Sequence, residues 1–177
     1  MNAQLDELIT VSEPRSPISE AYRTLRTNLD FASLDQALKT LAITSAGVGE
    51  GKSTTLANLA VVSAQAGRRV ILVDADLRRP SLHQIFGLDN EGGLTGAIMD
   101  EASQASPPLQ ETGIEGLRVL TSGPLPPNPA DVVGSRRMEE VIAALAEKAD
   151  QVFFDTPPVV AVTDAAVLAT KVDGVLL

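Results

Sequence analysis

The stretch Ser45–Thr54 constrains the fold of this chain more than any other feature of its sequence. It reads Ser-Ala-Gly-Val-Gly-Glu-Gly-Lys-Ser-Thr and follows the apolar run Leu41–Ile43. Its glycines allow the backbone to curl so that successive N–H groups point inward and form a nest for an anion. Lys52 adds a mobile positive charge for the outer phosphates, and the Ser53 hydroxyl can hold Mg²⁺. The stretch therefore predicts a phosphate loop for a nucleotide.

The segments on either side of this stretch supply the context that such a loop needs. Lys39–Thr44 is expected to be a strand, and Gly51–Ala66 a helix, because its small apolar residues recur at helical spacing. The positive end of that helix would face the same anion. A glycine-rich turn that binds nothing is the alternative. The strict motif has glycine where this chain has Ala46, and the expected nucleotide-binding residues are Gly47, Val48, Gly49, Glu50, Gly51, Lys52, Ser53 and Thr54.

Composition excludes several other classes of protein. The 177 residues suffice for one domain with a full core, and 44% hydrophobic against 21% charged residues is typical of a globular protein. A net charge of −9 argues against a nucleic-acid partner. The absence of cysteine removes disulfides and thiolate metal sites. No apolar run reaches the ~18 residues of a membrane helix, so a cytoplasmic domain is expected.

Carboxylates follow two further apolar runs that are expected to be buried strands. Arg69–Val73 leads into Asp74 and Asp76, and Val152–Phe154 leads into Asp155. The carboxyl ends of parallel strands meet at one edge of an open α/β sheet, and ligands bind at that edge. Asp155 is then placed to help hold Mg²⁺ opposite the serine of the phosphate loop. The alternative for the pair Asp74 and Asp76 is a turn and a helix cap.

The alternation of expected strands and helices predicts an α/β fold of the phosphate-loop NTPase kind, with a mostly parallel sheet flanked by helices on both faces. Residues 1–15 are polar and indicate an N-terminal arm or linker, and residues 16–177 form the phosphate-loop domain. The last residues are apolar and expected to lie within a strand, so a truncated C-terminus is expected. The carboxyl edge would gather Lys52, Ser53, Asp74, Asp76 and Asp155 around one magnesium-bound nucleotide.

The rest of the chain carries patterns for further short elements. Residues 101–113 are expected to be a loop, and the prolines between Gly123 and Pro129 predict a rigid extended connection. The first helix is expected at Pro17–Leu34, behind a serine cap. Further helices are expected at Ser81–Phe86, Gly93–Asp100, Ser135–Ala149 and Thr163–Thr170, and further strands at Leu117–Thr121 and Asp173–Leu177.

Three charged residues on the first expected helix share one face. Glu20, Arg23 and Arg26 are spaced three apart, so their side chains form a slanting stripe. The simplest interpretation is a solvated face with a Glu20–Arg23 ion pair. From the residues alone, this interpretation and a functional role for the stripe are equally well supported.

Taken together, these features resemble the bacterial tyrosine kinases that regulate capsular and exopolysaccharide production. The similarity runs from about Ile18 to the last residue. Besides the phosphate loop, it includes the motifs Glu20–Asn28, Val73–Arg78, Gly123–Pro129, Ser135–Met138, Asp155–Pro158 and Val162–Ala165. The resemblance implies an ATP-dependent protein-tyrosine kinase that uses Mg²⁺. It also implies that the stripe Glu20, Arg23 and Arg26 mediates ring-like self-association.

The resemblance assigns roles to the candidate catalytic residues. Lys52 would neutralise charge on the β- and γ-phosphates, and Ser53 with Asp76 would hold Mg²⁺. Asp155 would bind the metal through its water. Asp74 would accept the proton from an attacking tyrosine hydroxyl.

Two departures from the family bear on partners and location. The family usually has a tyrosine-rich tail, whereas this chain has only Tyr22, which lies in the expected assembly helix. The chain also contains no membrane-spanning adaptor region. A separate membrane adaptor or polysaccharide co-polymerase protein, or a missing membrane segment, would therefore bring the domain to the inner face of the cell membrane.

Two other functions stay open at this stage. One is a nucleotide-driven assembly switch, an ATPase of the septum-site or plasmid-partitioning type. Those proteins usually carry an extra lysine near the start of the loop, where this chain has Gly47, and that difference weakens this interpretation. The other is a catalytically silent module that binds nucleotide only to hold its shape.

Overall fold

A mixed but mainly parallel sheet forms the centre of the molecule. The structure is a computed structural model that describes residues 5–32, 38–100 and 105–177. Its six strands are β1 (Thr40–Ile43), β2 (Val70–Asp74), β3 (Gln110–Glu111), β4 (Leu117–Leu120), β5 (Gln151–Asp155) and β6 (Gly174–Leu176). They lie in the order β3-β4-β2-β5-β1-β6, and only the β3–β4 pair is antiparallel. The predicted mostly parallel sheet is confirmed.

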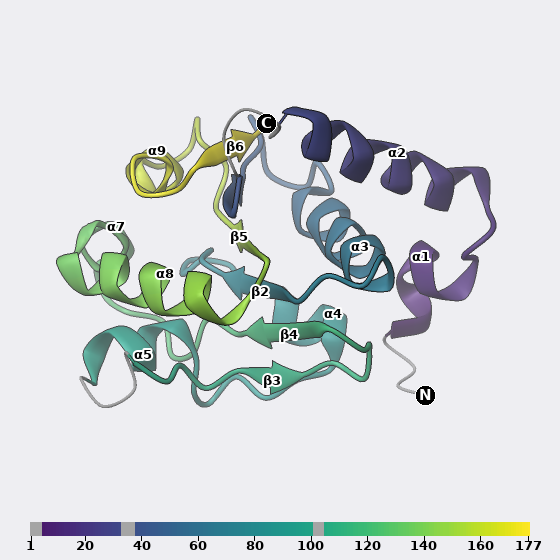
Figure 1. Ribbon diagram of the computed structural model, residues 1–177. Helices are drawn as coiled ribbons and strands as arrows, with labels where there is room; N and C mark the ends of the chain where they lie inside the picture. Colours follow the sequence, from purple (N-terminus) through teal and green to yellow (C-terminus); the bar gives the residue numbers. More distant parts are fainter. Residues whose placement is uncertain (1–4, 33–37, 101–104) are drawn as a thin grey trace.

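Helices cover both faces of this sheet (Figure 1). One face packs against α3, with α2, α4 and the N-terminal turns nearby, and the other packs against α5, α7, α8 and α9. Among the described residues, no helix is long and apolar enough to span a bilayer. The helices are the 3₁₀ turn η1 (Leu5–Glu7), α1 (Ile9–Ser12), α2 (Pro17–Ala32), α3 (Lys52–Gln65), α4 (Leu82–Phe86), α5 (Leu94–Met99), α7 (Pro129–Gly134), α8 (Arg136–Lys148) and α9 (Asp164–Ala169).

The two cores explain why the central strands are uninterrupted apolar runs. Successive strand residues point to opposite faces, so Leu72 of β2 joins the core under α3 while Ile71 and Val73 join the core on the other side. In β5, Phe153 and Phe154 divide in the same way. Because both faces are covered, an apolar residue is needed at every position.

The N-terminal segment is more ordered than the predicted arm or linker over residues 1–15. It forms η1 and α1, and Leu5 and Leu8 are buried in the core beside α3. The backbone N–H and the hydroxyl of Thr10 donate to Asn58 Oδ1 of α3, at 3.1 and 2.8 Å. The segment was predicted to be an arm because its overall composition is polar. Its two leucines are three residues apart, however, and this spacing places both side chains on the same side of a helical turn. Residues 1–4 of that prediction lie outside the described residues.

Three other elements differ from the sequence predictions. The predicted loop 101–113 contains the short strand β3, which pairs with β4; residues 101–104 of that loop are not described. The helix α7 was not predicted, and it begins at Pro129, the last residue of the predicted rigid connection. Proline is favourable at the first position of a helix because its missing N–H needs no partner there. The predicted end of the first helix, at Leu34, also falls outside the described residues.

The strand order brings the proposed site together. The strand β5 lies between β2 and β1, all three parallel, so their carboxyl ends are neighbours. Asp155 is aligned with Asp74 of β2 on one side and with Ile43 of β1 on the other. The phosphate loop follows β1, and it therefore starts beside the Asp155 end of β5, with the Asp74 end of β2 one strand further away.

Candidate active site

The phosphate loop leaves β1 and enters α3 at Lys52. Gly49 and Gly51 adopt φ values of 79° and 81°, a region that glycine tolerates and most side chains do not. The N–H groups of the first turn of α3 border the loop. A cavity of about 540 Å³ opens over it, lined by Ser45, Gly47, Val48, Gly49, Glu50, Gly51, Lys52, Ser53, Thr54, Asp76, Arg78, Arg79, Pro157, Pro158, Ala161 and Val162. The eight loop residues predicted to bind nucleotide are among these.

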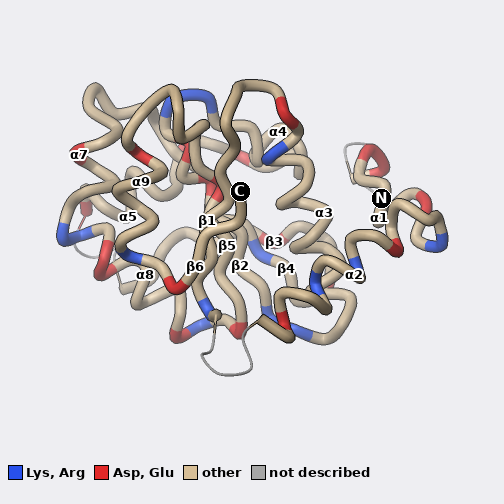
Figure 2. The backbone as a smooth tube through the Cα atoms, turned by 90° about the horizontal axis from the view of Figure 1, so that it is seen from above, with Lys and Arg blue, Asp and Glu red and all other residues tan. Residues whose placement is uncertain are grey.

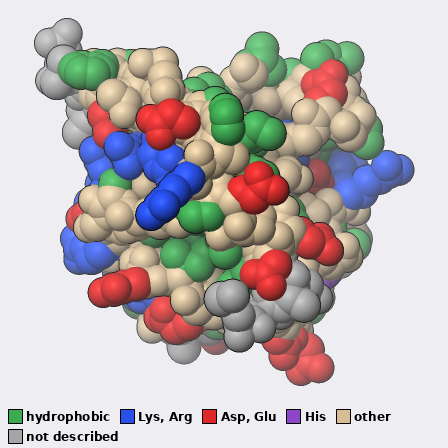
Figure 3. All heavy atoms as spheres, turned by 90° about the vertical axis from the view of Figure 1, so that its right-hand side faces the viewer, with side chains coloured by type: hydrophobic (Ala, Val, Ile, Leu, Met, Phe, Trp, Pro, Cys, Tyr) green, Lys and Arg blue, Asp and Glu red, His purple; other side chains and the backbone are tan. Residues whose placement is uncertain are grey.

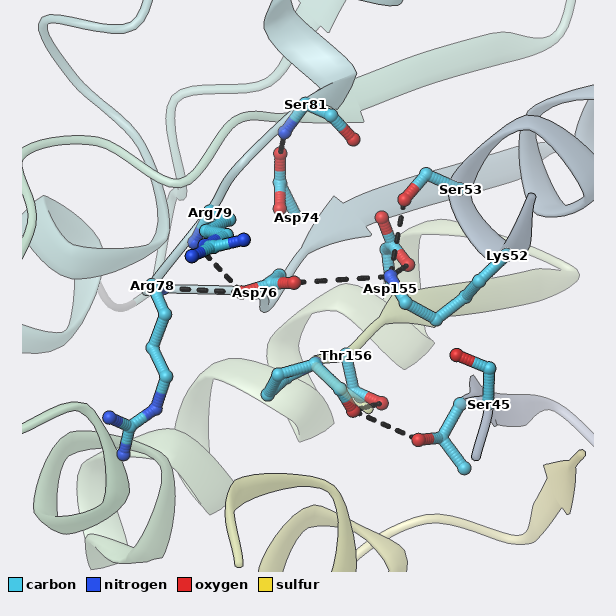
Figure 4. A network of polar contacts seen from close by, with 12 residues as sticks. Ser45, Lys52, Ser53, Asp74, Asp76, Arg78, Arg79, Ser81, Asp155 and Thr156 are labelled. Atoms are coloured by element: carbon cyan, nitrogen blue, oxygen red, sulfur yellow. Dashed lines mark hydrogen bonds and ion pairs between the residues drawn. The ribbon is translucent and has the colours of Figure 1, made fainter. Parts of the chain in front are cut away.

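The Lys52 ammonium lies between two carboxylates (Figure 4). Its Nζ is 2.5 Å from Asp155 Oδ1 and 3.9 Å from Asp76 Oδ2, and it is 3.1 Å from Ser53 Oγ. The side chain is only 9% exposed, so these contacts act in a partly desolvated site. The structure thus brings together Lys52, Ser53, Asp76 and Asp155 at one rim.

Asp155 keeps one carboxylate oxygen unused. The residue is fully buried, and its Oδ1 accepts the Lys52 bond, while Oδ2 has no hydrogen-bond partner among the described residues. Burial raises the pKa of Asp155, and the attraction of the Lys52 ammonium opposes that rise. A buried oxygen without a partner is costly unless a ligand or water completes it. Its position beside Lys52 makes it available to a bound group.

Asp76 serves both the turn and the site. Its Oδ1 accepts the backbone N–H groups of Arg78 and Arg79, at 3.2 and 2.9 Å, and its Oδ2 faces Lys52. The alternative interpretation of this aspartate as a turn former is therefore correct for one oxygen. The other oxygen lies on the cavity side.

Asp74, like Asp155, is fully buried and does not line the cavity, whereas Asp76 does. The Oδ2 of Asp74 accepts the N–H groups of Ser81 and Leu82, at 3.0 and 2.9 Å. Those bonds cap the start of α4, as the alternative interpretation expected. Its Oδ1 is buried without a partner among the described residues. Burial, with a smaller contribution from the charge of Asp155, raises the pKa of Asp74 to about 7.

This raised pKa predicts how stability depends on pH. The folded pKa of about 7 exceeds the ordinary value of 3.8, so the folded state holds a proton that the unfolded state releases. The stabilisation that this group contributes is fully present below the unfolded pKa of 3.8 and is lost as the pH rises through the folded pKa of about 7. Between the two values, the free energy of unfolding falls by up to about 1.4 kcal/mol per pH unit. Asp74→Asn, which cannot ionise, is expected to unfold at higher denaturant than the parent at pH 8, with the difference shrinking toward pH 4.

The measurement is urea unfolding of both proteins, without nucleotide or metal, across this pH range. Asp150→Asn is the control, because Arg69 lowers the pKa of the exposed Asp150 to about 2 and it stays charged throughout. Its effect should vary little between pH 5 and pH 8, because the ordinary value of 3.8 that applies to the unfolded state lies below that range. A pH-independent effect of Asp74→Asn would contradict the prediction.

The oxygens at the rim fit a magnesium site. Ser53 Oγ, Asp76 Oδ2 and Asp155 Oδ2 are hard oxygen donors, the type that Mg²⁺ prefers. Within the described ranges, no group of three or more His, Cys, Asp or Glu side chains could hold a metal by itself. A usual Mg²⁺ site combines one or two carboxylates with water and substrate phosphates.

The sequence interpretation assigned no role to a further pair at the cavity. Arg78 Nε and Nη2 donate to the two oxygens of Asp164, at 2.8 and 3.0 Å. Both residues belong to motifs on which the family resemblance was based. A two-pronged arginine–aspartate pair across 86 positions of sequence is a tertiary feature, so spacing could not reveal it.

The charged stripe of α2 is engaged within the molecule. Arg23 pairs with Glu20 at 3.0 Å and donates to the carbonyl oxygen of Pro14 at 2.5 Å. Arg26 donates to the carbonyl oxygen of Val62 in α3, at 3.2 Å. Figure 2 shows α2 and α1 at the periphery, outside α3. The predicted Glu20–Arg23 pair is present, and Glu20 remains 70% exposed.

Comparison with known proteins links this geometry to a nucleotide-binding family. Residues 41–176 match the family described as the CobQ/CobB/MinD/ParA nucleotide binding domain. That range contains the phosphate loop and the three candidate carboxylates, and it covers most of the chain.

Three similar proteins carry kinase names. Tyrosine-protein kinase YwqD of Bacillus subtilis is 49% identical over 170 residues, which cover 96% of this chain and 71% of that protein. The putative tyrosine-protein kinase CapB of Staphylococcus aureus is 39% identical over 173 residues, covering 98% and 75%. The solved kinase domain of the Escherichia coli tyrosine kinase ETK superposes with a TM-score of 0.89 at 35% identity, covering all of this chain and 73% of that one.

Proposed function

Since the chain belongs to the CobQ/CobB/MinD/ParA nucleotide-binding family and to the bacterial tyrosine-protein kinases, we propose that it transfers the γ-phosphoryl group of ATP to tyrosine hydroxyls. The observation that carries this proposal is the Lys52 ammonium, held between Asp155 and Asp76 at the mouth of the phosphate loop. A role in capsular or exopolysaccharide biosynthesis is part of the proposal, by analogy with that family.

Different residues of the chain bind different parts of the ATP. The N–H groups of Gly47–Thr54 surround the phosphates, and the ammonium of Lys52 moves from the carboxylates to the outer phosphates. Ser53 and Asp76 would hold Mg²⁺, and Asp155 would bind it through water. When bound, the metal ion neutralises phosphate charge and holds the triphosphate in one orientation. The residues mainly position and neutralise, which is most of what phosphoryl transfer asks of a protein.

Asp74 is the proposed proton acceptor. Its Oδ1 has no hydrogen-bond partner among the described residues, and its other oxygen accepts two backbone N–H groups. The residue lies on β2, the strand next to the one that carries Asp155. In the transfer, a bond forms between the tyrosine oxygen and the γ-phosphorus, the bond to the leaving ADP oxygen breaks, and the hydroxyl proton passes to the carboxylate. Because Asp74 is fully buried, the acceptor hydroxyl or one bridging water must enter beside Oδ1.

The experiment is incubation of the chain with γ-labelled ATP, Mg²⁺ and a glutamate–tyrosine copolymer as acceptor. Label on tyrosine is the expected result. Release of inorganic phosphate alone would support the assembly-switch ATPase instead, and nucleotide bound without turnover would support the silent module. Either of these outcomes would overturn the kinase proposal.

Self-association through the stripe of α2 is a second part of the proposal. Glu20 is exposed, and the side of the molecule toward which α1 and α2 project has interspersed acidic and basic side chains (Figure 3). Such a mixed surface can pair with an opposite pattern on another copy. A ring of subunits, located at the inner face of the cell membrane through a membrane adaptor or membrane segment, is the arrangement we propose.

Arg23→Ala combined with Arg26→Ala is expected to lower the mass of the assembly in solution while nucleotide binding stays unchanged. The substitutions remove two charges of the stripe, whose contacts are with Glu20, Pro14 and Val62, and neither arginine lines the cavity over the phosphate loop. Light scattering measures the mass, and a fluorescent ADP analogue measures binding. Arg136→Ala with Lys148→Ala on α8 removes the same charge and should change neither. Equal mass for the two double variants would refute the assembly role.

A further inference from the structure

An ion pair joins two segments that contribute to the cavity over the phosphate loop. Arg78 donates from Nε and Nη2 to both oxygens of Asp164, at 2.8 and 3.0 Å. Asp164 is only 1% exposed, whereas the arginine side chain is 39% exposed. Figure 4 shows the Arg78 side chain extending away from Asp76, so it does not compete for the carboxylate at the rim.

On one side, the pair anchors the turn that orients Asp76. The backbone N–H groups of Arg78 and Arg79 donate to Asp76 Oδ1, which leaves Oδ2 directed at Lys52, 3.9 Å away. The turn belongs to a short connection between β2 and α4, in which Leu77 is buried in the core and the Ala75 N–H donates to the carbonyl oxygen of Asp155. The Arg78 side chain adds a fixed point at the residue whose own N–H donates to Asp76. Holding the Arg78 side chain therefore also holds the two N–H groups that set the Asp76 carboxylate.

On the other side, the pair anchors the opposite part of the lining. Asp164 is the first residue of α9 and follows the segment that contributes Pro157, Pro158, Ala161 and Val162 to the cavity. That segment is also joined to the phosphate loop, because the N–H of Val159 donates to the carbonyl oxygen of Ser45 at 2.9 Å. Through the ion pair, the Asp76 turn, the segment 157–162 and the phosphate loop are connected by a continuous series of contacts around the cavity.

The geometry of the two charged groups explains why an arginine and an aspartate form this pair. Both oxygens of a buried carboxylate are satisfied by one guanidinium in two-pronged geometry, which a lysine cannot reproduce. Removing the arginine alone would leave a buried charge without a partner, and that is costly for the fold. Removing both charges avoids this cost.

We propose that the Arg78–Asp164 pair is a positioning clasp that fixes the Asp76 turn against the segment 157–162, so that phosphoryl transfer depends on it beyond its effect on stability. Neither residue is assigned to the reacting atoms; both act through Asp76. The inference rests on the proposed function, because it concerns the same cavity.

The test compares Arg78→Ala, Arg78→Ala/Asp164→Asn and Arg78→Lys with the unsubstituted chain. Arg78→Ala should unfold at a lower temperature, and adding Asp164→Asn should restore the midpoint to within about 3 °C. The double variant should nevertheless keep a kcat for tyrosine phosphorylation about tenfold or more below the parent. The KM for ATP should change much less. Arg78→Lys, with one bond in place of two, should give an intermediate kcat.

A readout without nucleotide measures the positioning itself. Amide hydrogen exchange at residues 78 and 79, corrected for the intrinsic rate of each residue type, should be about tenfold faster in the double variant, because the turn is no longer anchored. The matched control is Arg69→Ala/Asp150→Asn, which removes an arginine–aspartate pair at the amino ends of β2 and β5, and it should change neither kcat nor these amides.

Unchanged kcat and unchanged exchange at residues 78 and 79 in a folded double variant would overturn the clasp. If the double variant does not fold, Arg78→Lys takes its place in the test. A kcat and an exchange rate at residues 78 and 79 that both equal those of the parent would then overturn the clasp. Absence of tyrosine phosphorylation by the unsubstituted chain would refute the proposed function, and the exchange comparison would still decide whether the pair positions the turn.

Discussion

Lys52→Met is expected to reduce transfer of phosphate to tyrosine by about 10³-fold or more, the scale of losing a principal electrostatic contact to the transferred group. Methionine has a similar length but no charge, so the cavity keeps its shape while the phosphates lose their lysine. The same substitution leaves the buried Asp155 without the ammonium 2.5 Å away. We therefore also expect a shift of its pKa further upward and a lower unfolding temperature.

The measurement is the initial rate of tyrosine phosphorylation with labelled ATP, at a temperature well below both unfolding midpoints. Lys148→Met is the matched control, since that lysine lies on α8 and its ammonium contacts only the carbonyl oxygen of Ala105 among the bonds described. Its rate should equal that of the parent. Retention of most activity in Lys52→Met would remove this residue from the mechanism.

Asp155→Asn is expected to lower the same rate by about 10²- to 10³-fold, with ADP binding in the absence of metal largely kept. The amide has the size of the carboxylate but no charge, so it can neither bind a metal-held water as strongly nor balance Lys52. Of its two carboxylate partners among the described residues, Lys52 would retain Asp76, which is 3.9 Å away in the unsubstituted chain. The loss should therefore be accompanied by a weaker response of the rate to Mg²⁺.

Titration of the rate with Mg²⁺ checks this prediction, with Asp173→Asn as the control. Asp173 also accepts several bonds within the sheet, from the N–H groups of Lys39 and Thr40 and from the Thr40 hydroxyl, but at the amino end of β1. That variant can lose stability but should keep its magnesium dependence. Parent-like magnesium dependence in Asp155→Asn would contradict the role given to the carboxylate.

Sequence predicts the sheet well because its signals are local. A strand covered on both faces needs apolar residues at every position, so Val70–Asp74 and Gln151–Asp155 stand out as runs. The phosphate loop marks the junction of strand and helix. Given parallel strands, the acids at the strand ends must share one edge, and the structure places them there.

What the sequence could not predict depends on contacts between distant segments. The bond of Thr10 to Asn58 turns an apparently polar arm into part of the core, and it joins residues 48 positions apart. The pair of Arg78 and Asp164 spans 86 positions. Arg26 is bound by a backbone carbonyl of α3, a partner that no side-chain pattern displays.

The sequence also could not predict how deeply each of these aspartates is buried. Asp74 and Asp76 differ by two positions, yet one is enclosed behind the rim and caps α4 while the other reaches the cavity. The connection that turns after β2 decides this difference. A pattern of alternating acids gives their edge of the sheet and not their distance from solvent.

A crystal structure with Mg²⁺ and a non-hydrolysable ATP analogue tests the central claim most directly. The account predicts that the triphosphate occupies the loop Gly47–Thr54, that Lys52 Nζ has left Asp155 Oδ1 for the outer phosphates, and that the metal ion lies among Ser53, Asp76 and Asp155. A triphosphate bound elsewhere, or a Lys52 still paired with Asp155 beside bound nucleotide, would contradict it.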